Sequence, residues 1–177
     1  MRLFFFVMLF MLAACKQEGP DPGLLAKEKA EKMRHQSEVL QWRAGRIEKL
    51  KQPDGWLSLV GMHWLPQGVT RVGSGPANGT RIKVGPDNLG LITTNKRNQV
   101  WLQPDSIDGI TIDGKPMSGR TELVPDTRGT PTVVGLDGGR ASFIVIERGG
   151  RLALRVRDAD APTRIGFTGI DSFPIDR

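Results

Sequence analysis

His63 is the residue of this 177-residue chain best suited to acid–base chemistry, because it is the only histidine after the charged N-terminal segment. An imidazole titrates near neutral pH and acts as a general base when a second group positions it. With Asp158 as that group and Arg155 beside it, His63 would form a candidate hydrolase site. The alternative is a histidine packed or hydrogen-bonded at the edge of the core, since Trp56 and Trp64 flank it in sequence.

Arg155 and Arg157 are candidate ligand-binding residues, because residues two apart on a strand lie on the same face. Neighbouring guanidiniums bind carboxylates or phosphates through paired hydrogen bonds, and Arg164 follows closely enough to join them. The competing interpretation is an internal network with Asp158 and Asp160 that fixes the strand end. The two aspartates could also form a carboxylate pair for hydrolysis, although their spacing in sequence does not set their separation in space.

Other common catalytic and metal-binding patterns do not occur in the sequence. A single cysteine excludes a disulfide within the chain and any cysteine-based zinc site. The segment Gly73-Ser74-Gly75 does not extend to a Gly-x-Ser-x-Gly nucleophile elbow, no phosphate-binding loop is present, and the chain contains no tyrosine. We therefore expect no metal and no cofactor, and a binding or structural role is favoured over catalysis.

The N-terminus has the layout of a secretory signal, with Arg2 followed by an apolar run from Leu3 to Leu12. Ten apolar residues are too few to cross a bilayer, which needs about 20 in a helix. The ending Leu12-Ala13-Ala14-Cys15 resembles the lipobox of bacterial lipoproteins. This resemblance implies cleavage after residues 1–14 and lipidation of Cys15; an ordinary cleaved signal with a coincidental cysteine is the alternative.

Lipidation at Cys15 would place the protein in the cell envelope, held to a membrane by its acyl chains. Each buried methylene contributes about 0.8 kcal/mol, so several chains give permanent anchoring. By analogy with enterobacterial lipoproteins, Lys16 after the cysteine favours the outer membrane or the periplasmic face in a Gram-negative cell. We expect residues 15–23 to form a lipidated tether, because residues 16–23 hold two prolines, two glycines and no apolar side chain.

Residues 24–51 predict a charged helix, because they contain one glycine, no proline and many strong helix formers. This segment holds eight basic and four acidic residues, whereas residues 52–177 hold fifteen basic and thirteen acidic residues. A nearly balanced folded region argues against nucleic acid as a partner. The helix could contact anionic lipid or envelope polymer, or its charges could simply be solvated.

Residues 52–177 predict a mainly β domain, in which short apolar runs alternate with turn residues; the whole chain contains 22 glycines and 12 prolines. Asp113-Gly114 and Gly149-Gly150 each favour a tight hairpin turn, because both central positions of a type I′ turn need a positive φ. About nine strands without intervening helices indicate a β-sandwich or a partly open barrel. The expected strands are Thr70–Gly73, Arg81–Val84, Leu89–Thr93, Gln99–Leu102, Ile110–Ile112, Thr121–Val124, Thr132–Val134, Ala141–Arg148 and Arg151–Arg157.

Two sequence blocks resemble the DUF1684 family of bacterial proteins, many of them exported. The first runs from Trp42 through the segment Pro53–Leu65, and the second runs from Phe143 through Asp158 to Pro174. The resemblance implies placement in the family without a mechanism, since no activity is established for it. Family members continue beyond the point that corresponds to Arg177, which suggests a domain incomplete at its C-terminus whose functional residues lie in the missing part.

Within this domain, Arg71-Val72-Gly73-Ser74 is similar to the opening of a forkhead-associated (FHA) β-sandwich. The Ser-x-x-His motif of FHA domains does not follow, so the resemblance implies an FHA-like fold and not phosphopeptide binding. The sequence therefore predicts a lipid-anchored envelope protein that acts as a non-catalytic binding or structural module. Its partner would be an envelope protein or a small ligand; the alternatives are a hydrolase using His63 with Asp158 and Arg155, or a truncated family member.

Overall fold

A computed structural model describes residues 21–176 of the chain. These residues divide into two compact units, one of residues 21–43 with 173–176 and the other of residues 44–172. The predicted signal peptide and the lipidated Cys15 lie outside the described residues, as does most of the predicted tether.

Helix α1 (Pro22–Lys51) confirms the helix that the composition predicts for residues 24–51, with a start two residues earlier. Asp21 stabilises that start, because its carboxylate accepts a hydrogen bond from the main-chain N–H of Gly23 at 2.8 Å. The helix buries none of its side chains and ends with Lys49 and Lys51 in its last turn, where positive charge favours the helix dipole. None of the helices in the described part of the chain combines the length and apolar character needed to cross a membrane.

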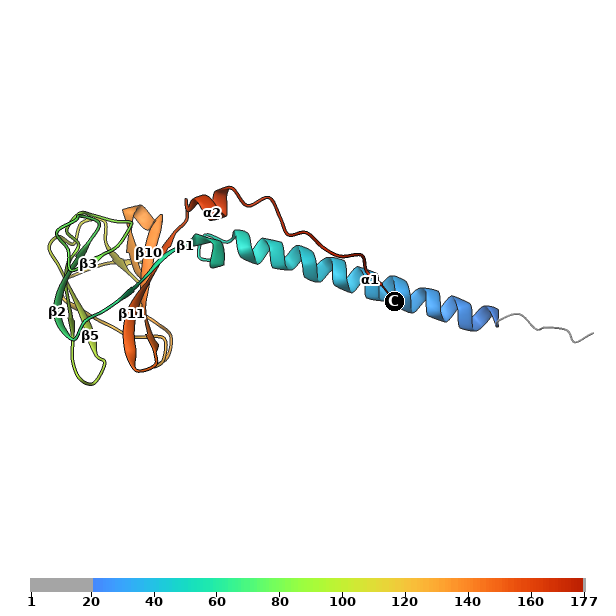
Figure 1. Ribbon diagram of the computed structural model, residues 1–177, viewed down its shortest axis with the longest axis horizontal. Coiled ribbons are helices and arrows are strands. Elements are labelled where there is room, and N and C mark those ends of the chain that lie inside the picture. Colours follow the sequence, from blue (N-terminus) through green and yellow to red (C-terminus); the bar gives the residue numbers. More distant parts are fainter. Residues whose placement is uncertain (1–20, 177) are drawn as a thin grey trace, which may run out of the picture. The chain divides into compact units, whose positions relative to one another are not determined.

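Two sheets form a β-sandwich, with β1, β10 and β11 in one layer and β2, β3 and β5 in the other (Figure 1). The six-stranded sheet has the order β1 (Leu59–Trp64), β11 (Arg151–Asp158), β10 (Ala141–Arg148), β9 (Val134–Leu136), β6 (Thr111–Ile112) and β7 (Lys115–Pro116). The five-stranded sheet has the order β3 (Thr80–Arg81), β2 (Gly68–Gly73), β4 (Gly90–Thr94), β5 (Val100–Pro104) and β8 (Thr121–Leu123). The short helices are η1 (Trp56–Ser58), η2 (Asp137–Gly139) and α2 (Pro162–Ile165). The two sheets do not close into a barrel, so β1 and β3 remain edge strands.

The core lies between the sheets and is built from the inward-facing residues of each strand. Phe143 pairs with Val156 across the β10–β11 hairpin, and the inward apolar side chains of this hairpin are buried. Ile92 and Leu102 contribute fully buried side chains from the other sheet. The alternation of these strands in sequence predicts this face, because successive side chains of a strand point to opposite sides of its sheet. Both predicted tight turns are confirmed by positive φ angles at Asp113, Gly114, Gly149 and Gly150.

Several strands differ from the sequence prediction. Strand β7 was not predicted, and the strand predicted over residues 132–134 is found two residues later, as β9. The prediction did not assign β1 as a strand, because its residues do not alternate cleanly: the register shifts between Leu59 and Gly61, which places a bulge in the strand. The predicted strand over residues 81–84 is too long, since ladder pairing covers only Thr80–Arg81. Ile82 and Val84 are nevertheless buried between exposed neighbours, so the rim of the sandwich imposes a strand-like pattern without strand pairing.

Candidate binding face and edge pocket

The outer surface of β1 and β11, together with η1, carries aromatic and basic side chains that are far apart in sequence. We call it the arginine–tryptophan face and define it by Trp56, Met62, Trp64, Arg151, Arg155 and Arg157. Met62 lies opposite Arg155 in the β1–β11 ladder, so both side chains point away from the core. Trp56 is 72% exposed and Met62 is 53% exposed, so large apolar side chains share this surface with the arginines.

The aromatic rings of this face lie under guanidinium groups. The Cζ atom of Arg151 is 4.3 Å from the ring centroid of Trp64, and that of Arg155 is 5.9 Å from the ring centroid of Trp56. Such cation–π contacts position a guanidinium without using its hydrogen-bond donors. Beneath the face, Ile144 and Ala153 belong to a small outward cluster of buried residues that gives it a packed base.

Arg157 is half-buried, and its Nε is buried with no hydrogen-bond partner in the described structure. Neither Arg155 nor Arg157 forms an ion pair with a described carboxylate. A buried donor without a partner and two neighbouring like charges both cost free energy. Arg155, which the ring of Trp56 orients, and Arg157, which has an unused buried donor, are suited to binding an anionic group.

Asp126 is a carboxylate that the charge of Arg155 influences, but it is already paired with Arg148. Its carboxylate accepts hydrogen bonds from Nη2 of Arg148 at 2.8 Å and from the main-chain N–H of Glu147 at 3.0 Å. The hydrogen bond from Arg148 is the main cause that holds the pKa of Asp126 below its usual value, and the charge of Arg155 adds to it. Arg148 therefore has a carboxylate partner, whereas Arg155 and Arg157 do not.

The arginine–aspartate network expected at the end of β11 is present, but it contains a different arginine. Asp158 accepts a hydrogen bond from Nη1 of Arg140 at 2.8 Å, and Arg140 also pairs with Asp137 at 2.6 Å. Asp158 also accepts a hydrogen bond from the main-chain N–H of Asp160 at 2.9 Å. Sequence reasoning missed Arg140, because the hairpin and η2 bring it to Asp158 from 18 positions away.

Arg164 is held by main-chain carbonyls and lies apart from the other two predicted ligand-binding arginines. Its Nε donates to the carbonyl of Lys51 at 2.7 Å, and its Nη1 donates to the carbonyl of Ala159 at 2.6 Å. These bonds link α2 to the last turn of α1. They give Arg164 a structural contact, whereas the guanidinium of Arg155 stacks over the ring of Trp56 and Nε of Arg157 has no hydrogen-bond partner in the described structure.

The structure does not bring His63 together with Asp158 and Arg155 as the hydrolase alternative requires. His63 lies opposite Leu154 in the β1–β11 ladder and therefore shares the inner side of the sheet, whereas Arg155 points outward. Asp158 is four residues further along β11, about 13 Å at the usual rise of a strand. A general base and its partner must come within hydrogen-bond reach, so this combination of residues does not form a catalytic site.

His63 is a half-buried histidine on an edge strand, which agrees with the alternative of a histidine packed at the edge of the core. Its neighbour Trp64 points to the opposite side of β1, and the imidazole instead packs against Gly61, where a side chain would overlap Nε2. Nε2 is buried and has no hydrogen-bond partner in the described structure. Burial, and secondly the charge of Lys83, lower the pKa of His63 below its usual value. The imidazole is therefore neutral near pH 7.

His63 lines a pocket of about 680 Å³ together with Ser74, Arg81, Ile82 and Lys83. The sequence did not identify this pocket, because β1 and the segment that follows β3 come together only when the sheets pack. We call it the edge pocket. A second hollow lies along α1 and is lined by Leu25, Glu28, Lys29, Glu31 and Lys32.

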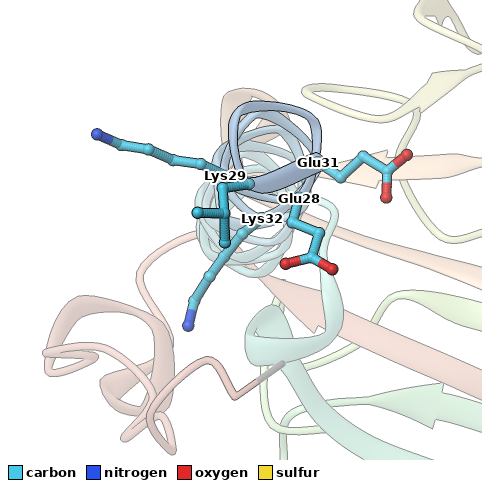
Figure 2. A pocket seen from close by; sticks show the side chains of 5 residues that line it. Glu28, Lys29, Glu31 and Lys32 are labelled. Carbon is cyan, nitrogen blue, oxygen red and sulfur yellow. The ribbon is translucent and has the colours of Figure 1, made fainter. Parts of the chain in front are cut away.

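The hollow along α1 is not a binding site. Figure 2 shows Lys29 and Lys32 pointing away from Glu28 and Glu31, and all of them come from a single helix. Side chains that diverge from one helix cannot surround a ligand. Among residues 21–176, no group of three or more histidine, cysteine, aspartate or glutamate side chains could hold a metal ion.

The class of protein that the fold defines is a β-sandwich preceded by a helix. The chain matches no protein-family model, and no curated protein matches it. The function therefore has to be argued from the residues themselves.

Proposed function

We propose that this chain is a lipid-anchored envelope protein whose β-sandwich binds an acidic protein segment without catalysing a reaction. The observation that carries the binding role is the pair of outward guanidiniums, Arg155 and Arg157, which have no carboxylate partner among the described residues. The envelope location rests on the lipobox-like ending at Cys15. Membership of the DUF1684 family stays a prediction from the two sequence blocks.

The composition of the arginine–tryptophan face supports a protein partner. Tryptophan, methionine and arginine are enriched at protein interfaces, and a few such residues supply most of the binding free energy. Here two tryptophans and Met62 are exposed around the arginines, on strands that fix their side-chain directions. Positive charge selects an acidic partner, and the rings bury its apolar atoms.

Absence of catalysis is supported by the separation of the candidate groups. His63 points toward the core side of β1, Asp158 is paired with Arg140, and Arg155 points outward. None of these three side chains contacts another in the described structure, so they cannot share a proton during a reaction.

The lipid anchor predicts that Cys15→Ala loses membrane association. The wild-type protein should stay with the membrane after a high-salt wash, and its intact mass should correspond to a chain starting at Cys15 with acyl chains added. The variant should move to the supernatant, because a charged tether and helix without acyl chains bind lipid weakly. A Cys15→Ala protein that still sediments with washed membranes would exclude the anchor.

The binding role predicts that the full chain, kept in detergent, binds poly-L-glutamate with an affinity that falls as salt rises. The double variant Arg155→Gln/Arg157→Gln should bind at least about tenfold more weakly, because each charged hydrogen bond contributes about 1.5 to 3 kcal/mol. Arg97→Gln is the matched control, since Arg97 is exposed and lies outside the face. Equal binding of poly-L-glutamate by the double variant and the control would refute the role of the arginine–tryptophan face. Competition by free glutamate would indicate that the face binds a small ligand.

A further inference from the structure

The edge pocket lies where the sandwich is open. β1 is the edge strand of the six-stranded sheet, β3 is the edge strand of the five-stranded sheet, and the two are in contact without pairing (Figure 1). Side chains that follow β3 therefore meet His63 from β1 across this open edge. A rim between two sheets is a common place for a ligand, because no strand pairing closes it.

The pocket presents two positive charges on an apolar floor. Ile82 lines the pocket and is fully buried, and the alternation of the chain leaves its neighbours Arg81 and Lys83 exposed. Nε of Arg81 donates to the carbonyl of Ser74 at 2.9 Å, which orients the guanidinium. Neither Arg81 nor Lys83 forms an ion pair with a described carboxylate, so both charges face the pocket unneutralised.

Asp87 is the nearby carboxylate that could compete, and its side chain is hydrogen-bonded to Ser74, one of the lining residues. Its Oδ1 lies 3.1 Å from the hydroxyl of Ser74, which is also 3.0 Å from the carbonyl of Gly85. The main-chain carbonyl of Asp87 accepts a hydrogen bond from Asn78 at 2.6 Å. Because His63 is neutral, the two cations exceed this single negative charge.

We propose that the edge pocket binds the phosphate group of a small molecule, with Arg81 and Lys83 as its ligands. A guanidinium fork and an ammonium approach from separate positions, which suits a tetrahedral anion with several acceptor oxygens better than a planar carboxylate. The volume of about 680 Å³ leaves room for the rest of a phosphorylated molecule next to Ile82 and the imidazole of His63. This site is separate from the arginine–tryptophan face, because His63 and Met62 point to opposite sides of β1.

The test uses the imidazole as a reporter within the pocket. The full chain is prepared in detergent with isotope-labelled histidine, and the signals of His35 and His63 are distinguished with a His35→Gln variant. Millimolar inorganic phosphate should raise the pKa of His63 by roughly half a unit, since a nearby negative charge favours the protonated imidazole. The same ionic strength of sodium chloride should leave it unchanged.

The double variant Arg81→Gln/Lys83→Gln should lose the phosphate response but keep its thermal unfolding midpoint and its binding to poly-L-glutamate. Lys115→Gln is the matched control, because this exposed lysine lies on β7, at the edge of the six-stranded sheet opposite to β1 and His63. Glycerol phosphate giving a larger response than inorganic phosphate would identify a phosphorylated small molecule as the source. An equal response to acetate, an equal response in the double variant, or no response at all would each overturn the proposal.

Discussion

Gly90→Ala should lower the free energy of unfolding by about 2 to 6 kcal/mol, which is much of the 5 to 15 kcal/mol that holds a typical domain together. Gly90 lies in β4 with φ of +147° and pairs with both Val72 and Pro104. A side chain there would overlap the carbonyl oxygen of Gln103 and lie 2.7 Å from Cα of Pro104. Backbone strain and overlap with rigid main-chain atoms each cost about 1 to 3 kcal/mol.

Gly119→Ala separates these two causes. Gly119 has a nearly identical φ of +144°, but no atom lies within 4 Å of the added methyl group. Gly119→Ala should lower the free energy of unfolding only by the cost of backbone strain, about 1 to 3 kcal/mol. Urea unfolding of the two variants measures both losses, with the midpoint shifting and the slope unchanged. Equal losses of unfolding free energy in the two variants would mean that the close approach of β4 and β5 at Gly90 contributes nothing to the effect of Gly90→Ala.

Local patterns predicted the elements whose neighbours in space are also neighbours in sequence. The β10–β11 hairpin follows from strict alternation around Gly149-Gly150, and both of its strands were predicted to within one residue. The helix follows from its composition, and the Asp113-Gly114 turn follows from the need for positive φ. In each case a short stretch of chain contains all the information that the structure requires.

Features that depend on how the sheets pack could not be predicted. The bulge in β1 disturbs its alternation, and without that strand the sequence does not show that His63 and Arg155 point to opposite sides of a sheet. The partner of Asp158 is Arg140, which reaches it through the turn at η2 rather than along a strand. The sequence predicted Arg155 and Arg157 as ligand-binding residues but could not show that Arg155 stacks over Trp56 or that Arg151 stacks over Trp64.

Arg157→Met should raise the free energy of unfolding by roughly 1 kcal/mol while weakening binding to poly-L-glutamate. Nε of Arg157 is buried without a partner, and a donor in that state costs about 1 to 3 kcal/mol. Methionine retains the apolar stem that packs on the sheet and removes both the orphaned donor and the repulsion from Arg155. If Arg157 instead stabilised the fold, Arg157→Met would lower the free energy of unfolding, because contacts of the arginine would be lost.

Arg151→Met on the same face of β11 is the matched control. Arg151 is exposed, and its guanidinium stacks on Trp64, so its loss should lower stability by about 0.5 to 1 kcal/mol. Urea unfolding should therefore give opposite signs for two arginines on one strand. A loss of stability in both variants would show that Arg157 supports the fold. The main support for anion binding at the arginine–tryptophan face would then be removed. A gain confined to Arg157→Met would mean that the free chain carries an unfavourable charge there, which a bound anion relieves.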